Sequence, residues 1–143
     1  MRIFKTKSLA KFARQHGISD ESLVEAVNRA KRGLIDADLG GQVIKQRVAR
    51  PGQGKRGGFR MLIGFGSNRS VFLYAFAKNE RENISSGELL SLREIAETLL
   101  KASQEEIAKA LTDGTIIEVH DGSKSKKEGR TQSAQQGTAG NGE

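Results

Sequence analysis

Residues 43–85, VIKQRVARPGQGKRGGFRMLIGFGSNRSVFLYAFAKNERENIS, contain two strongly apolar runs. Neither run, at 59–65 and 71–77, alternates with polar residues, so both are predicted to be central strands covered on both faces. Residues 66–69 between them form a hairpin-type turn. The two runs therefore predict a sheet with a buried centre, and the rest of the chain must cover it.

Cations are concentrated around these strands. Residues 45–60 hold six of them and no acid: Lys45, Arg47, Arg50, Lys55, Arg56 and Arg60. Residues 43–84 carry nine Lys and Arg but two Asp and Glu, whereas residues 85–120 carry three and seven. A focused positive field of this kind attracts a polyanion, either nucleic acid or an acidic protein. A generally basic surface is the alternative, but such surfaces normally mix both signs of charge.

The length of 143 residues allows one domain with one core. The absence of cysteine excludes disulfides and thiolate metal sites. Charges interrupt the first residues, so they do not form a signal peptide, and residues 71–77, the longest apolar run, fall far short of the roughly 20 residues of a bilayer span. We therefore expect a cytoplasmic protein without membrane contact.

Residues 121–143 hold no large apolar side chain, which predicts a disordered tail after a domain of residues 1–120.

Capping signals place the expected helices. Ser8 is expected to cap a short helix that ends at Gly17. Ser19, followed by two acids, begins a second helix. Two Ser-x-x-Glu capping boxes, at 85–88 and 103–106, begin two more helices.

Further strands are expected at residues 2–6 and at 43–50, and Pro51 ends the second of them because it cannot donate to a ladder. Residues 116–119 are expected either to form a last strand or only to cover the core. Residues 36–41 are expected to form a loop. The order of elements predicts an α+β fold, in which a small antiparallel sheet packs against N-terminal helices and a C-terminal helix, with the helices on one side.

Several enzyme classes lack support. No Gly-x-Ser-x-Gly, His-Glu-x-x-His, Rossmann or P-loop pattern occurs. His16 and His120 are far in sequence from the basic centre, so neither is expected to be a catalytic base. Asp36 and Asp38 have no further oxygen ligands at the spacing of a calcium loop, so no metal site is expected there.

RNA cleavage remains open to a cationic site because RNA carries its own nucleophile, the 2′-hydroxyl. The reaction needs removal of the 2′ proton, stabilisation of negative charge on the phosphorane and protonation of the leaving 5′ oxygen. Fixed arginines supply the second requirement, and a lysine crowded by other cations can move a proton.

The blocks RVARPGQGKRGGFR and FAKNERENI, separated by two apolar strands, resemble the RelE/ParE toxin superfamily on its RelE-like branch. The resemblance covers roughly residues 1–120. It implies a small α+β fold, ribosome-dependent cleavage of mRNA and a cognate antitoxin, typically of helix-turn-helix type. It implies no metal or organic cofactor.

The resemblance also implies roles for individual residues. Lys45 and Arg47 would contact RNA and stabilise charge, and Arg60 would hold the scissile phosphate. Asn79 and Arg81, on the turn after the last strand, complete the implied catalytic set. The predicted RNA contacts are Arg50, Lys55, Arg56 and Lys78, of which Lys55 and Arg56 on the Gly-rich loop would position phosphate. Binding of the acidic antitoxin is the alternative role of Arg47 and Arg50.

The sequence differs from RelE itself at two of the implied positions. RelE has an arginine where Asn79 aligns and a tyrosine near Ser85. Tyr74 lies inside a predicted buried strand, and Asn83 and Ile84 are expected to lead into the next helix. The group that transfers protons is therefore unassigned.

Two other functions fit the same sequence. A ParE-like toxin would keep the fold and inhibit DNA gyrase by binding. A non-catalytic RNA-binding module would use the same cations, although the chain has only six Phe and one Tyr to stack on bases.

Overall fold

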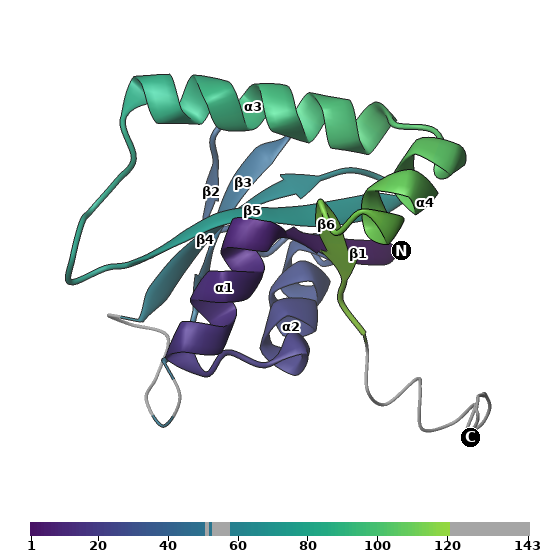
Figure 1. The fold of residues 1–143 in the computed structure, drawn as a ribbon. Helices are drawn as coiled ribbons and strands as arrows, with labels where there is room; N and C mark the ends of the chain where they lie inside the picture. Colours follow the sequence, from purple (N-terminus) through teal and green to yellow (C-terminus); the bar gives the residue numbers. More distant parts are fainter. Residues whose placement is uncertain (51, 53–57, 121–143) are drawn as a thin grey trace, which may run out of the picture.

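The computed structural model describes residues 1–50, 52 and 58–120, which form an α+β fold (Figure 1). Its elements are β1 (Arg2–Thr6), α1 (Lys7–His16), α2 (Asp20–Lys31), β2 (Ala37–Asp38), β3 (Val43–Val48), β4 (Phe59–Phe65), β5 (Arg69–Ala77), α3 (Ser86–Lys101), α4 (Gln104–Thr112) and β6 (Ile116–Glu118). The predicted fold class is confirmed. The expected tail and Pro51 lie outside the described residues. None of the described helices is long and apolar enough to span a membrane.

The described strands form one six-stranded sheet in the order β2-β3-β4-β5-β1-β6. Every neighbouring pair is antiparallel except β1 and β5, which run parallel. The two apolar runs of the sequence, β4 and β5, occupy the centre of the sheet, as predicted. Their lack of polar alternation follows from this position, because both faces of a central strand are covered.

Helices cover both faces of the sheet, so the expectation of helices on one side is wrong (Figure 1). Side chains of α1 and α2 pack with Met61 and Ile63 in one core. Side chains of α3 and α4 pack with Leu62 in a second core on the opposite face. Successive residues of β4 point to opposite faces and both sets are apolar, so each face requires its own layer of helices.

Most capping predictions hold. Ser19 caps α2, and both capping boxes form at the starts of α3 and α4. Gly17 adopts a left-handed conformation, with φ 67°, at the end of α1. The expected cap of α1 is wrong: Thr6 accepts from the amide of Leu9, and Ser8 lies inside the helix.

A register shift between β4 and β5 changes which side chains of β5 reach each face. Ile63 pairs with Phe72 and Leu62 with Tyr74, so Leu73 is an extra residue in β5. Leu73 and Tyr74 therefore both face the core beneath α3, although they are consecutive. Bulges re-aim side chains in this way.

Gln46 ties the segment before β2 to the sheet. This side chain is fully buried, and its amide nitrogen donates to the carbonyls of Ala26 at 3.0 Å and Leu34 at 3.1 Å. Its oxygen accepts from the amide of Asp36 at 2.8 Å. Residues 37–38, expected to lie in a loop, instead form β2, which pairs with β3.

The first prediction concerns this buried amide. Gln46→Leu removes three hydrogen bonds and should lower the free energy of unfolding by about 2–4 kcal/mol, because the partner groups lose their bonds in a water-free site. Urea unfolding measures the change. Gln15→Leu, at an exposed position of α1, is the control and should change stability by less than about 0.5 kcal/mol. Equal stabilities of the two variants would contradict this role of Gln46.

Candidate functional site

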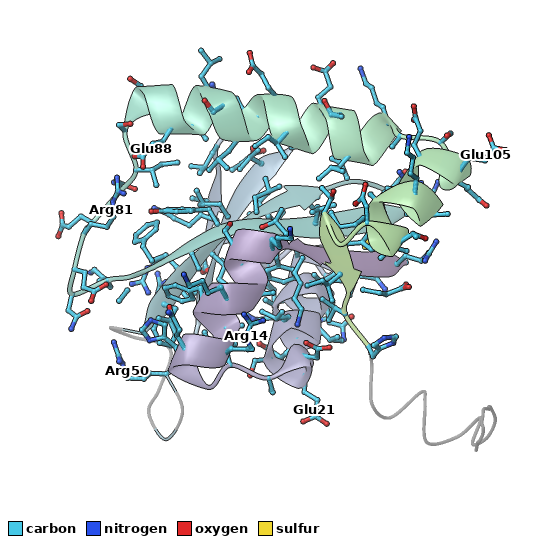
Figure 2. All side chains as sticks on the ribbon, in the orientation of Figure 1. Arg14, Glu21, Arg50, Arg81, Glu88 and Glu105 are labelled. Carbon is cyan, nitrogen blue, oxygen red and sulfur yellow. The ribbon has the colours of Figure 1, made fainter. Side chains whose placement is uncertain are left out.

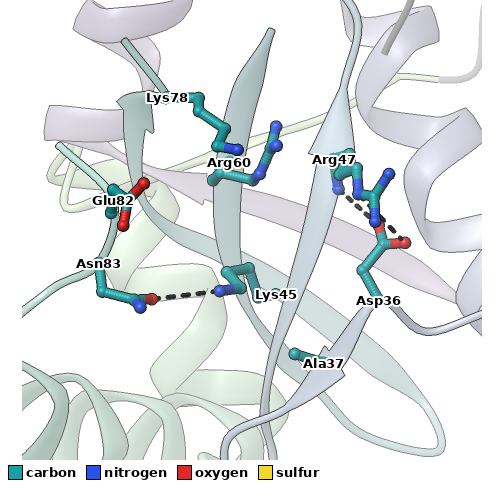
Figure 3. A pocket seen from close by; sticks show the side chains of 8 residues that line it. All are labelled: Asp36, Ala37, Lys45, Arg47, Arg60, Lys78, Glu82 and Asn83. Carbon is teal, nitrogen blue, oxygen red and sulfur yellow. Dashed lines mark hydrogen bonds and ion pairs between the residues drawn. The ribbon is translucent and has the colours of Figure 1, made fainter. Parts of the chain in front are cut away.

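A pocket of about 300 Å³ opens on the α3 side of the sheet (Figure 3). Arg60 points to this side because it is two residues from Leu62 on β4, and Leu62 packs beneath α3. The lining residues come from the segment before β2, from β2, β3 and β4, and from the connector between β5 and α3. They are Asp36, Ala37, Lys45, Arg47, Arg60, Lys78, Glu82 and Asn83.

Two arginines form the floor of the pocket. Arg47 on β3 and Arg60 on β4 are directly opposite each other in the register. Arg60 is only 9% exposed, and no described residue forms an ion pair with it. Burial and the nearby charge of Arg47 hold the pKa of Arg60 below its usual value, while Asp36 acts in the opposite direction. Like charges that face each other across a ladder are destabilising, so this pair costs stability.

Asp36 compensates part of this charge. Its carboxylate accepts from the backbone amide of Arg47 at 2.7 Å and lies 3.8 Å from the Arg47 Nε. The same carboxylate lies 3.5 Å from a guanidinium nitrogen of Arg29 on α2. Arg29 also pairs with Glu25 and donates to the Arg47 carbonyl. One carboxylate is thus shared between two arginines, and the pocket keeps a positive excess.

The connector between β5 and α3, residues 78–85, supplies the remaining wall. Lys78 lies where β5 ends, and its backbone amide donates to the carbonyl of Gly58 at 3.1 Å. The Asn83 side-chain oxygen accepts from the Lys45 ammonium at 3.1 Å. Glu82 lines the pocket beside these cations, yet among the described residues it has no hydrogen bond or ion pair.

Arg81, predicted to be catalytic, does not line the pocket. It forms a two-bond ion pair with Glu88 on α3, at 2.8 and 3.3 Å, and Figure 2 shows the two side chains together at the start of that helix. It also donates to the Tyr74 hydroxyl at 3.3 Å. Tyr74 is partly exposed rather than enclosed in the core, contrary to expectation. Asn79 is exposed and lies outside the pocket lining.

Arg50 lies on the other face of the sheet, away from the pocket. Its guanidinium stacks over the ring of Phe59, 4.8 Å from the centroid, and Phe59 belongs to the core beneath α1 and α2. The rings of Phe12 and His16 pack against Phe59 from α1. Lys55 and Arg56 lie outside the described residues.

The structure therefore brings together four of the predicted residues: Lys45, Arg47, Arg60 and Lys78. Sequence reasoning missed Asp36, Ala37, Glu82 and Asn83. Asp36 was considered only as a metal ligand, and among the described residues no cluster of three His, Asp or Glu could hold a metal. Asn83 was expected to lead into the next helix. The sequence did carry one signal for Glu82: it is an acid within an otherwise basic block, which marks it as a residue that could face the cations.

This arrangement can bind a phosphate group. Two guanidiniums and two ammoniums converge on one open pocket, and arginine presents donors in a planar fork that matches phosphate oxygens. The low exposure of Arg60 strengthens its interaction with an anion, because less water screens its charge than at the surface.

A family profile described as RelE toxin of RelE / RelB toxin-antitoxin system matches residues 1–119. The match spans most of the chain, so this protein belongs to the RelE toxin family. The resemblance noted from the sequence is confirmed, and the protein is a toxin of a toxin–antitoxin system with an antitoxin as its partner. No curated protein matches the chain.

The second prediction concerns the pair that holds Arg81. The Arg81 guanidinium, with the amide and hydroxyl of Ser85, lowers the pKa of Glu88 from 4.5 to about 2. The stabilisation from this pair is therefore present above pH 4.5 and is lost as the pH falls toward 2. In Arg81→Gln the pKa of Glu88 should rise toward its ordinary value, as followed by NMR titration of the side-chain carboxyl carbon.

Glu97 provides the control for this titration. Lys101 lowers the pKa of Glu97 by a hydrogen bond within α3. Arg81→Gln should leave the pKa of Glu97 unchanged, and Lys101→Gln should raise it without moving that of Glu88. A Glu88 pKa that stays near 2 in Arg81→Gln would show that Arg81 is not the main cause of the shift.

Proposed function

We propose that this toxin is an endoribonuclease that cleaves mRNA during translation, with the cationic pocket as its active site. The observation that carries the proposal is the pair of Arg47 and Arg60, which lie opposite each other in the register and face one pocket, and whose charge Asp36 balances only in part. A purely structural sheet gains nothing from this pair. A site for a developing phosphorane charge needs such donors already in place.

The reaction proposed is attack of the 2′-hydroxyl on the adjacent phosphate. Arg60, which is little exposed, holds the scissile phosphate, and Arg47 stabilises the additional charge of the phosphorane. Lys45 and Lys78 contact the same phosphate or its neighbours. Arg50, Lys55 and Arg56 are proposed to contact RNA outside the pocket. Phosphate contacts of this kind position the nucleic acid on the protein and take no part in the cleavage step.

Asn79 and Arg81 remain proposed members of the catalytic set through the family resemblance. Their positions require the connector to move when substrate binds, because Arg81 is bound to Glu88 and neither residue lines the pocket. Arg47, Arg60 and the lysines need no such movement, so they carry most of the proposed chemistry.

The proposed partners are the translating ribosome with its mRNA and a helix-turn-helix antitoxin. Residues 1–120 are proposed as the toxin domain, with residues 121–143 outside it. A protein that acts on translating ribosomes would work in the cytoplasm.

Inducible expression with and without the antitoxin tests this function, with growth, translation and mRNA 5′ ends as readouts. Growth arrest with new mRNA ends within coding regions is expected. Growth arrest with unchanged mRNA ends and a DNA-damage response would favour inhibition of gyrase instead. Salt-dependent RNA binding without cleavage or arrest would favour a binding module.

The third prediction is that Arg60→Met abolishes growth arrest without unfolding the protein. Removing one fixed donor to the phosphorane should lower the cleavage rate about 10²–10³-fold. The free energy of unfolding should rise by about 0.2–1 kcal/mol, because the repulsion across the ladder disappears and an apolar chain of similar length remains. Toxicity assays and urea unfolding measure the two effects.

Arg14→Met is the matched control. Arg14 is exposed on α1, on the other face of the sheet, so the same exchange should leave toxicity unchanged. Full toxicity of Arg60→Met, at equal expression, would place the active site elsewhere.

A further inference from the structure

The pocket contains one carboxylate without a partner among the described residues. Asp36 is engaged by Arg29 and by the backbone and side chain of Arg47. Glu82 is exposed, and Figure 3 shows it projecting from the connector into the space between Lys78 and Asn83. An acid that lines a pocket of cations without pairing is free to accept a proton.

The neighbour of Glu82 gives the pocket a positioned proton donor. The Asn83 side-chain oxygen accepts a hydrogen bond from the Lys45 ammonium at 3.1 Å. This bond uses one of the three N–H groups of the ammonium, so the other two can donate into the pocket. An amide oxygen fixes the direction of the ammonium without neutralising it. The connector thus contributes a free carboxylate and orients an ammonium through adjacent residues.

The two groups reach the pocket at different points along the connector. Glu82 lies on the side of Lys78, whereas the Lys45 ammonium lies at the Asn83 side chain (Figure 3). A phosphate bound between these two points would have the proton acceptor and the proton donor on different sides, as displacement at phosphorus requires.

We propose that Glu82 is the proton acceptor of the RNA cleavage site and that Lys45, positioned by Asn83, is the proton donor; this assignment rests on the proposed nuclease function. Glu82 takes the proton of the 2′-hydroxyl as the bond between O2′ and phosphorus forms. The bond between phosphorus and O5′ breaks, and O5′ takes a proton from the Lys45 ammonium. The products are a 2′,3′-cyclic phosphate and a 5′-hydroxyl, and exchange with water restores both side chains.

Charges from every neighbouring element bear on Glu82. They are Asp36 before β2, Lys45 and Arg47 on β3, Arg60 on β4, Lys78 at the end of β5, and Arg81 with Glu88 at the start of α3. The cations among them outnumber the acids, so Glu82 lies in a net positive field that also attracts phosphate.

Glu82→Gln tests the assignment, because it should move binding and cleavage in opposite directions. The variant loses a negative charge next to the phosphate site, so its affinity for mRNA should be equal or higher. Its single-turnover cleavage rate should fall about 10²–10⁴-fold, the usual contribution of a positioned acid or base. The substrate is mRNA on programmed ribosomes and, in parallel, the same mRNA free in solution.

The pH profile separates chemistry from a structural effect. Without a positioned acceptor, hydroxide must remove the 2′ proton, so the Glu82→Gln rate should rise about tenfold per pH unit between about pH 6 and pH 9. The wild-type rate should not rise in this way, because Glu82 rather than hydroxide accepts the proton. A variant profile parallel to that of the wild type would overturn the assignment.

Glu80→Gln is the matched control, with the same change of charge in the same connector but outside the pocket lining. It should match the wild type in rate and profile, and Glu82→Asp should recover part of the lost rate. A loss in Glu80→Gln equal to that in Glu82→Gln would also overturn the assignment. If the wild type cleaves neither substrate, the nuclease function itself fails, whereas cleavage by both wild type and Glu82→Gln at equal rates rejects only the role of Glu82.

Discussion

The opposition of Arg47 and Arg60 is the constraint around which this toxin is built. The register between β3 and β4 places both guanidiniums on one face, and a slip by one residue would turn either arginine toward the core beneath α1 and α2. The register must therefore be held against the repulsion that it creates. Asp36 contributes by binding the backbone of one arginine, and Gln46 holds Asp36 in place.

The two cores provide the remaining stabilisation. β4 carries Arg60 in the middle of the sheet, between β3 and β5, and its other side chains up to Ile63 are buried against helices on both faces. Burial of this kind is the dominant favourable term in folding, so a local electrostatic cost at one end of the strand is tolerated. Strained or repulsive arrangements that persist in stable folds are commonly found at functional sites.

Local signals predicted much of this structure, and long-range contacts account for what was missed. The capping box of Ser85 and Glu88 could be predicted because both partners lie within four residues. Asp36 could not be placed, because its partners belong to α2 and β3. Tyr74 was misassigned because the apolar sequence of β5 does not mark its bulge. The apolar stripe of α3 gave no indication of which face it would cover.

Glu88 links the start of a helix to the geometry of the pocket. Its carboxylate accepts from the Ser85 amide, which completes the capping box, and from Arg81, which fixes the connector against α3. Lys78 fixes the other end of the connector through its hydrogen bond to Gly58. Glu82 and Asn83 lie between these two attachments and face the pocket. Arg81, which was predicted to belong to the catalytic set, thus serves in this conformation to hold the connector that supplies the pocket with its unpaired acid.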